Sequence, residues 1–385
     1  MIIHNLHAEK ILDSRGNWTV RAYVNGISGT APSGASTGTY EAKVIPADKA
    51  VDMINTKLQR LVGESFNQTD ADILIETLDG TDNFDKIGGN TAIAVSFAVF
   101  NAIHNSKKIT KEIFPYPLGN VFGGGAHGGS TTFQEFLALP TKAGSMYEAL
   151  DTNVQLHKRL RETLNRKAKT VGINDEGALT ADIDDFKALD IITDLAEDVG
   201  CRIGLDVAAS EFFNKGKYTY RSLKRTLTPE DQLDFLTETA KKYRLAYIED
   251  PFEENDFKNT QELTKKIGNR CLVCGDDLFV TDEKRLQKGI TLGAANSLII
   301  KPNQAGTISL AQDTMTLAKK HDITPIVSHR SGETEDSTIS RLALFWGAPI
   351  IKAGVIDMRI SKLNELIHLW NMAETPKMAK LKLNR

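Results

Sequence analysis

Residues 201–352 alternate between short apolar runs and helical patterns, and most of the runs recur at intervals of about 25 residues. Residues 308–320 form one of the helical patterns. The apolar runs contain few polar positions, which is typical of parallel strands that are buried on both faces. The alternation therefore predicts an α/β fold of the (β/α) barrel type, in which the carboxyl ends of the strands meet at one mouth.

A second helical pattern, at residues 230–243, has a complete start signal. Thr228 is suited to the N-cap position, Pro229 to the first helical position and Asp231 to closing a capping box. A helix is therefore predicted to begin directly after Thr228.

Six of the apolar runs end in an ionisable residue. One charged residue in this position usually marks only the point where a strand meets solvent, but six in succession are difficult to explain in that way. Three carboxylates, two lysines and one histidine at one mouth indicate a metal-dependent active site, and they are Asp206, Glu249, Asp276, Lys301, His329 and Lys352. Alternation along a strand predicts that the neighbouring Asp250 and Asp277 point away from the metal.

Residues 1–116 are predicted to form a separate, smaller α+β domain, followed by the barrel at residues 117–385. Residues 20–24 and the segments around Ile11 and Ile27 resemble an antiparallel meander that turns at Asn25 and Gly26. Pro115, Pro117 and Gly119 interrupt the pattern and mark the expected boundary.

Three helices are expected within this first domain. Residues 46–62 carry one apolar face, and residues 70–78 are preceded by Thr69 as the expected N-cap. Residues 91–103 are apolar almost all round, which predicts a helix buried between the two domains.

The composition excludes several classes of function. The 385-residue chain has a net charge of −3, so no global field attracts it to nucleic acid or a membrane. Residues 1–15 are too polar for a signal peptide, and no apolar run approaches membrane-spanning length. The three cysteines fit a reducing compartment, and Cys271 and Cys274 should point to opposite faces of one strand. A cytoplasmic protein is expected.

Two glycine-rich loops and one acidic turn are further candidates for chemistry. Residues 31–38 contain Ser33, Ser36 and Thr37, which could bind a hard cation or a phosphate, although this segment by itself is better explained as an ordinary surface loop. Residues 123–129 lack the features of a P-loop, but their glycines would let the backbone approach a small ligand with His127 aimed into the site. The acidic turn at residues 174–177 precedes the first barrel carboxylate.

Several motifs resemble the enolase family, in the family's order and over nearly the whole chain. The most specific is Ser-His-Arg-Ser-Gly-Glu-Thr-Glu-Asp at residues 328–336. The others lie at residues 11–17, 32–38, 204–206, 210–213, 248–252, 275–278 and 301–304. The resemblance implies a modified (β/α)8 TIM-type barrel with a small N-terminal α+β domain. It also implies the interconversion of 2-phosphoglycerate with phosphoenolpyruvate and water, and a homodimer.

The resemblance assigns a role to each candidate residue. Asp206, Glu249 and Asp276 would bind the first Mg²⁺, and Ser36 would close over the site and bind the second. Lys301 would be the general base, and Glu176 would protonate the departing hydroxyl with Glu135 beside it. The substrate would be contacted by His127, Gln134, His329, Arg330, Ser331 and Lys352, with Arg330 and Ser331 on the phosphate and Lys352 on the carboxylate.

Several departures from the family pattern suggest a divergent member. The loop between His127 and Glu135 is one residue shorter, and Ala178 replaces a glycine, which would be strained at a positive φ. Ala353 and Trp18 are further replacements, and residues 355–361 are shortened. Two alternatives stay open: a paralogue that dehydrates a related phospho- or phosphono-hydroxy acid, and a binding or scaffold protein without turnover.

Overall fold

The N-terminal part of the protein begins with a three-stranded antiparallel meander of β1 (Leu6–Leu12), β2 (Trp18–Val24) and β3 (Ile27–Thr30). The computed structural model describes residues 1–34, 40–105 and 112–383. The turn between β2 and β3 falls at Asn25 and Gly26, whose φ angles are 51° and 81°. Positive φ at both positions matches the twist of the flanking strands, so the predicted meander and its turn are confirmed.

The helices of this part differ from the predicted ones at two points. The helix expected over residues 46–62 is divided at Thr56 into α1 (Ala47–Asn55) and the 3-10 helix η1 (Lys57–Leu61). The N-cap expected at Thr69 is wrong, because α2 (Gln68–Asp79) begins earlier and Asn67 accepts the backbone N–H of Asp70 at 2.9 Å. Asparagine is as good an N-cap as threonine, and the earlier start lets Gln68 reach Asp72 from the first turn.

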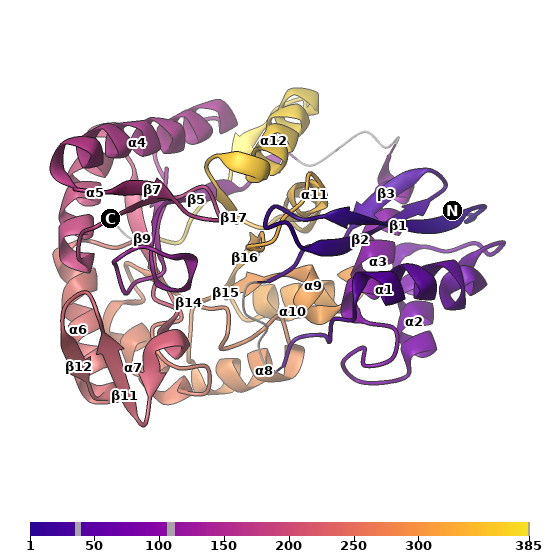
Figure 1. Ribbon diagram of the computed structural model, residues 1–385, viewed down its shortest axis with the longest axis horizontal. Helices are drawn as coiled ribbons and strands as arrows, with labels where there is room; N and C mark the ends of the chain where they lie inside the picture. The colour runs from indigo at the N-terminus through magenta and orange to yellow at the C-terminus, as the bar shows by residue number, and fades with distance from the viewer. Residues whose placement is uncertain (35–39, 106–111, 384–385) are drawn as a thin grey trace.

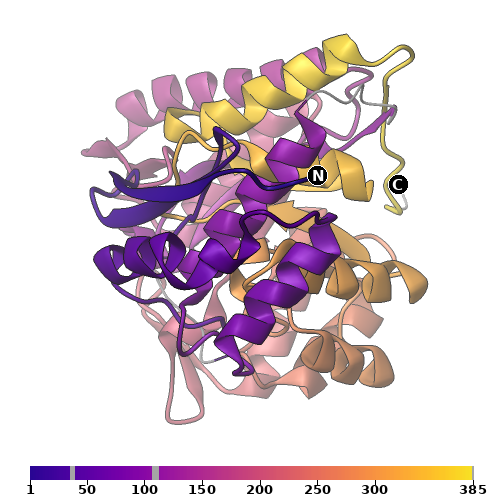
Figure 2. The ribbon, with the colours of Figure 1, turned by 90° about the vertical axis from the view of Figure 1, so that its right-hand side faces the viewer.

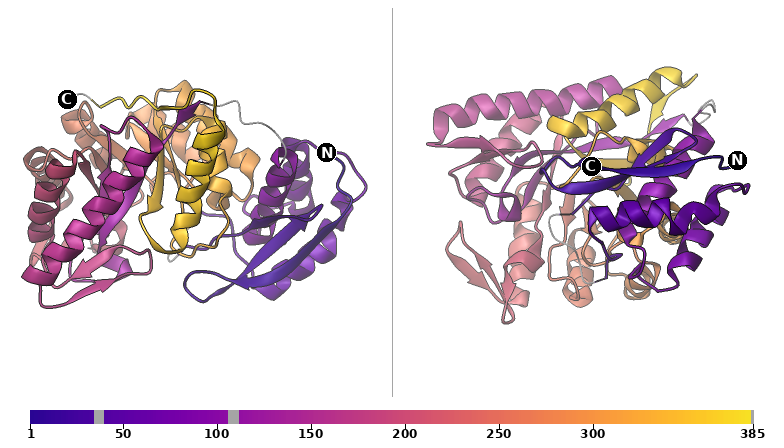
Figure 3. Two further views of the ribbon diagram at one scale, coloured as in Figure 1. Left: turned by 90° about the horizontal axis from the view of Figure 1, so that it is seen from above. Right: turned by 45° about the vertical axis from the view of Figure 1, so that its right-hand side comes forward.

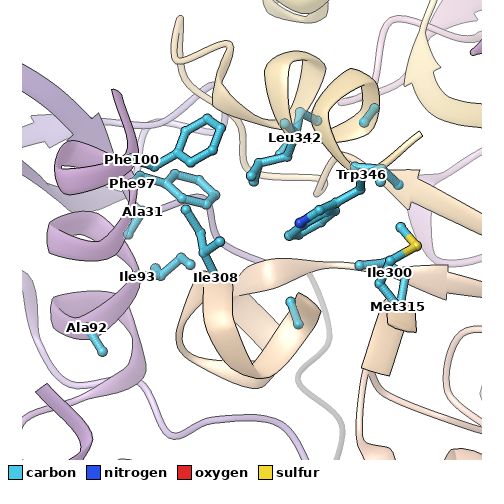
Figure 4. Close-up of a cluster of buried hydrophobic side chains, with 14 of the residues drawn as sticks. Ala31, Ala92, Ile93, Phe97, Phe100, Ile300, Ile308, Met315, Leu342 and Trp346 are labelled. Atoms are coloured by element: carbon cyan, nitrogen blue, oxygen red, sulfur yellow. The ribbon is translucent and has the colours of Figure 1, made fainter. Parts of the chain in front are cut away.

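The apolar helix α3 (Gly89–His104) lies between the meander and the barrel, as predicted (Figures 1 and 4). Figure 4 shows Phe97 and Phe100 directed toward Ile308 and toward Leu342. Close packing requires Gly29 on β3, since a Cβ there would lie 2.2 Å from the backbone nitrogen of Ala98. This helix fixes the position of the N-terminal part over the barrel.

The second part is a closed barrel of eight strands. Strand β6 is antiparallel to both of its neighbours, whereas the other strands pair in parallel and β17 closes the barrel on β5. The strands in barrel order are β5 (Tyr116–Gly123), β6 (Glu135–Leu139), β9 (Arg202–Asp206), β13 (Tyr247–Glu249), β14 (Leu272–Gly275), β15 (Ser297–Ile300), β16 (Thr324–Ser328) and β17 (Ile350–Gly354). The predicted barrel is confirmed, in a modified form.

Helices cover the outside of the barrel (Figures 2 and 3). The predicted capping box is present, since the Thr228 side chain and the Asp231 carboxylate each bind the other's backbone N–H. These helices are α4 (Met146–Lys167), α5 (Asp185–Val199), α6 (Pro229–Lys242), α7 (Phe257–Ile267), α8 (Glu283–Leu292), α10 (Ile308–Lys320), α11 (Thr338–Trp346) and α12 (Ile360–Met372). The four-residue helix α9 (Pro302–Ala305) instead follows Lys301 at the mouth of the barrel.

Pro117 and Gly119 were expected to mark a domain boundary, but both lie inside β5, which pairs with β6 on one side and with β17 on the other.

Short elements complete the fold. The shorter elements are β4 (Ile113–Phe114), η2 (Gly125–His127), β7 (Val171–Ile173), β8 (Leu179–Ala181), η3 (Ala209–Phe212), β10 (Phe213–Asn214), β11 (Lys217–Tyr220), β12 (Arg225–Leu227), η4 (Asp357–Arg359) and β18 (Lys377–Met378).

Cys271 and Cys274 point to opposite faces of the segment that contains β14, as predicted. Cys271 belongs to the apolar cluster that includes the α5 and α6 side chains, whereas Cys274 belongs to the cluster inside the barrel. All three cysteines are buried and free. Across the described ranges, no helix has the length and apolar character needed to cross a membrane.

Candidate active site

The carboxyl ends of the barrel strands surround a polar cavity, and the candidate residues converge on it. Glu249 is fully buried and does not line the cavity, and Ser36 lies outside the described residues. The other candidates line the cavity: His127, Gln134, Glu135, Glu176, Asp206, Asp276, Lys301, His329, Arg330, Ser331 and Lys352. The structure therefore brings together residues from the six predicted strand ends and from both loops after β5 and β7.

Three buried carboxylates stand side by side because of the strand register. Asp206 on β9 is paired with Glu135 on β6 and with Glu249 on β13. The Lys352 ammonium lies 2.7 Å from a Glu135 oxygen, 3.0 Å from Asp206 and 2.7 Å from Glu249. Burial acts to lower the pKa of Lys352, but the three carboxylates outweigh it and hold the pKa well above its usual value.

This cluster contains three carboxyl groups and only one ammonium, so Lys352 could not neutralise all of them in their ionised forms. Burial raises the pKa of Glu249 well above its usual value, and the nearby Asp206 charge raises it further. The Oε1 atom of Glu249 is buried and has no hydrogen-bond partner within the described part of the chain. A buried acceptor without a donor is costly unless a cation or another ligand binds it.

The donor set fits a hard divalent cation. One carboxylate oxygen of Glu249, one of Asp250 and one of Asp276 all lie within 4.8 Å of one another. Asp206 joins this group through Lys352, which bridges it to Glu249. Carboxylate oxygens are the ligands that Mg²⁺ and Ca²⁺ prefer, so these residues could hold such an ion.

The prediction that Asp250 points away from the metal-binding carboxylates is wrong, because one of its oxygens lies within 4.8 Å of oxygens of Glu249 and Asp276. Asp277 also lines the cavity, and its orientation relative to a metal stays a prediction. Asp250 has a φ of 41°, which ends the alternation of β13, and its two carboxylate oxygens accept the backbone N–H groups of Asp276 at 3.0 Å and Asp277 at 2.9 Å. Asp250 thus positions the segment that carries Asp276.

Lys301 lies at the amino end of α9 with its ammonium in contact with the Asp276 carboxylate. Burial acts to lower the pKa of Lys301, but the charge of Asp276 outweighs it, so the pKa is raised. Gln304 donates to the other Asp276 oxygen at 3.1 Å. Without a bound cation, Lys301 is therefore held in its protonated form.

The opposite side of the cavity holds Glu176, Glu135 and His127. Asn120 donates to Glu176 at 3.1 Å. Burial acts to raise the pKa of Glu176, but His127 and a hydrogen bond with Glu135 outweigh it, so the pKa is lowered. Burial raises the pKa of Glu135. The two neighbouring carboxyl groups are therefore shifted in opposite directions, Glu176 toward the ionised form and Glu135 toward the protonated form.

Ala178 causes no strain in the acidic turn. The positive φ of the turn, 80°, falls on Gly177, and Ala178 is outside the positive-φ region. The Asn174 side chain closes the turn by accepting the N–H groups of Glu176 at 3.0 Å and Ala178 at 2.9 Å. The strain considered for an alanine here is therefore absent, because the neighbouring glycine takes the left-handed conformation.

The loop between β16 and α11 forms the third side of the cavity. The Arg330 guanidinium binds Glu41 at 3.0 Å and donates to Asn303 at 3.1 Å. Ser33 and Gly332 exchange two backbone hydrogen bonds of 2.8 Å, which attach the loop after β3 to the barrel. Gly34 lines the cavity as a result. The N-terminal part thus covers the mouth of the barrel.

Three residues of the site were not identified from the sequence. Glu41 binds Arg330, Asp175 binds His127 at 3.0 Å, and Arg359 binds His329 at 3.3 Å. Each is an ordinary charged residue outside the barrel strand ends. The local signals were the acidic turn at residues 174–177, which contains Asp175, and the unusual segment at residues 355–361, which contains Arg359.

His127 is predicted to make a pH-dependent contribution to stability in metal-free buffer. Burial acts to lower its pKa, but the hydrogen bond with Asp175 and the charge of Glu176 raise it from 6.5 to about 9. The contribution is complete below pH 6.5, the usual value, and is lost as the pH rises through about 9. His127→Asn should therefore lower the free energy of unfolding by roughly 3 kcal/mol at pH 6 and by much less at pH 10, as measured by urea unfolding. An equal loss at both pH values would contradict the assignment.

Comparison with known proteins agrees with this geometry. The model of the enolase N-terminal domain matches residues 3–114, and the model of the enolase C-terminal TIM barrel domain matches residues 111–380. Proteins named enolase from Methanosphaera stadtmanae and Archaeoglobus fulgidus are each 42% identical to this chain. The first alignment covers 99% of both chains, and the second covers 98% of this chain and 99% of its relative. The protein belongs to the enolase family.

Proposed function

We propose that this protein is a hydro-lyase that catalyses the reversible, Mg²⁺-dependent dehydration of 2-phosphoglycerate to phosphoenolpyruvate in glycolysis and gluconeogenesis. The observation that carries the proposal is the buried cluster of carboxylates with an unpartnered Glu249 oxygen, adjacent to the Lys301 ammonium. Full-length relatives named enolase support it.

Two Mg²⁺ ions are proposed for each site. Asp206, Glu249 and Asp276 would hold the first, and Ser36 would contribute to the second. When bound, the ions would supply positive charge where the substrate carboxylate gains negative charge. This charge matters because a carbon next to an ionised carboxylate is an extremely weak acid.

Lys301 is the proposed base that removes the proton from this carbon. Its amine can accept a proton once Asp276 no longer neutralises the ammonium, since the pairing with Asp276 is what raises its pKa. Lys352 would bind the substrate carboxylate, because its ammonium is buried at the level of the metal-binding carboxylates.

The phosphate would bind to Arg330 and Ser331. A guanidinium presents two parallel N–H groups that match phosphate oxygens, and Glu41 and Asn303 hold the Arg330 side chain in a fixed position. Gln134 and His329 would contact the rest of the substrate, since both line the same cavity.

Glu176 is the proposed acid for departure of the hydroxyl, with His127 and Glu135 beside it. The pKa of Glu176 is lowered in the substrate-free protein, whereas burial raises the pKa of Glu135. Glu176 would therefore have to take up a proton before it could donate one to the departing hydroxyl.

The two alternatives have less support. The paralogue hypothesis relied on altered loops, but Ala178 leaves the acidic turn unstrained. A scaffold protein has no need for unneutralised carboxylates in its core, which reduce stability. The proposed location is the cytoplasm, which is supported by the free, buried cysteines.

Removal of divalent metal should abolish formation of phosphoenolpyruvate from 2-phosphoglycerate in a coupled assay, and Mg²⁺ should restore it. Mg²⁺ should also raise the melting temperature, because a ligand that binds only the folded state stabilises it. Glu249→Gln should lose most of this stabilisation. Full turnover in metal-free buffer would refute the mechanism, and turnover only with phosphonate analogues would identify a paralogue.

Lys301 and Glu176 should be separable by isotope exchange. Lys301→Ala should abolish both dehydration and exchange of the α-proton with deuterated solvent, by about 10³-fold or more. Glu176→Gln should stop dehydration but retain some exchange, because proton removal needs only the base. Lys265→Ala, whose side chain is 58% exposed, is the control and should behave as wild type. Near-normal dehydration by Glu176→Gln would transfer the acid role to Glu135.

A homodimer is also proposed. Leu12 and Trp18 are cross-strand partners at the end of the β1–β2 hairpin, and they are 53% and 60% exposed. Burial of this pair against a second copy would remove apolar surface from water. Light scattering at micromolar concentration should give at least twice 42.4 kDa, for a homodimer or a higher homo-oligomer, and a species of only 42.4 kDa would contradict the proposal.

A further inference from the structure

The segment from η4 to α12 places two buried cations behind the active-site loop at residues 328–336. The Arg359 side chain is fully buried, and Lys362, three residues later, is 1% exposed. Neither side chain lines the substrate cavity. Burial of two cations is costly unless each has specific partners, so their contacts indicate what they hold.

Arg359 contacts two different parts of the site. Its Nε group donates to His329 Nδ1 at 3.3 Å, and its Nη2 group donates to the carbonyl oxygens of Arg330 at 3.3 Å and Ser331 at 2.5 Å. Its Nη1 group donates to the carbonyl oxygen of Asp175 at 2.8 Å, directly before Glu176 in the chain. One guanidinium thus joins the loop after β16 to the turn that carries Glu176.

The contact with His329 determines where that imidazole carries its proton. A guanidinium has five N–H donors, no acceptor, and stays protonated in proteins. The Nδ1 atom that faces it must therefore be the acceptor, which leaves the single proton of a neutral His329 on Nε2. Burial lowers the pKa of His329 well below its usual value, and the charge of Arg359 adds to this effect.

The space for Arg359 depends on a glycine in β17. A Cβ on Gly354 would lie 2.7 Å from the carbonyl oxygen of Glu176 and 3.0 Å from the Cδ atom of Arg359. The arginine stem and the Glu176 backbone are therefore packed against the same point of the barrel. This packing prevents the guanidinium from moving independently of the acidic turn.

Lys362 holds the same loop through other residues and contacts neither His329 nor the acidic turn. Its ammonium lies 2.7 Å from Glu333 Oε2 and also binds the carbonyl oxygen of Thr334. Glu333 in turn accepts the backbone N–H of Arg330 at 2.9 Å. Lys362 is therefore a matched control, because it supports the loop but does not bind His329 or Asp175.

We propose that Arg359 is a positioning residue for the proposed dehydration: it fixes His329 as the Nε2–H tautomer and aligns this imidazole with the turn that carries Glu176. His329 then presents a hydrogen-bond donor to the cavity. The proposal rests on the proposed function for its kinetic consequence, but the tautomer of His329 can be measured without any activity.

The decisive experiment is ¹⁵N NMR of the full-length protein labelled at histidine, with the His329 signals assigned by difference from His329→Gln. Wild type should show a protonated Nε2 and an unprotonated Nδ1. Arg359→Met should give a mixture of tautomers, whereas Lys362→Met should leave the His329 signals unchanged. A proton on Nδ1 in wild type would overturn the proposal even if Arg359→Met does not fold, and so would an unchanged tautomer in a folded Arg359→Met.

Kinetics give an independent readout. Arg359→Ala should lower kcat by about 10- to 100-fold with little change in KM, because a misplaced group costs rate more than binding. Added guanidinium ion should restore part of the rate for Arg359→Ala and none for Lys362→Ala. Equal rescue of both variants, or of neither, would indicate a merely structural role. A wild-type protein with the expected tautomer but no dehydration would refute the proposed function and leave the His329 assignment intact.

Discussion

The buried ammonium of Lys352 is the interaction on which the rest of the site depends. Three strands in register bring Glu135, Asp206 and Glu249 together at the mouth of the barrel, and each of these carboxylates is nearly inaccessible to water. Without a cation among them, these carboxylates would take up protons or move into solvent, because burial of unpaired charges is costly. Lys352 reaches all three only because β17 pairs with β5 and closes the barrel. The strand pairing that closes the barrel is therefore also the pairing that completes the site.

Lys352 leaves part of the negative charge uncompensated, and this imbalance makes the site suited to its proposed chemistry. The buried Glu249 oxygen lacks a hydrogen-bond donor, and Lys301 is paired with Asp276. Packing of the barrel alone gives no reason for either feature. A divalent cation would bind the Glu249 oxygen and replace Lys301 as the partner of Asp276. The N-terminal part adds the remaining constraint, since Glu41 holds Arg330 and the Ser33–Gly332 contact holds the loop over the mouth.

Local features of the structure followed the sequence closely. The capping box at Thr228, the turn at Asn25 and Gly26, and the strand ends at Asp206 and Glu249 all depend on residues near one another in the chain. The wrong predictions concern positions where the chain has a second local solution. Asn67 and Thr69 are both good N-caps, and Asp250 leaves the strand alternation because it adopts a positive φ to bind two backbone N–H groups of the next strand's loop.

The sequence by itself determined the alternation of strands and helices over residues 201–352, the N-terminal meander, and that ionisable side chains stand at the barrel's carboxyl end, because periodicity and caps are encoded within a few residues. Only the tertiary structure decided which of those side chains touch. The antiparallel course of β6 places Glu135 beside Asp206, and Lys352 reaches Asp206 across 146 residues of sequence. Arg359 binds His329 and the Asp175 carbonyl across gaps of 30 and 184 residues. Such contacts are set by barrel closure and by the cost of burying charge, neither of which leaves a periodic trace in the chain.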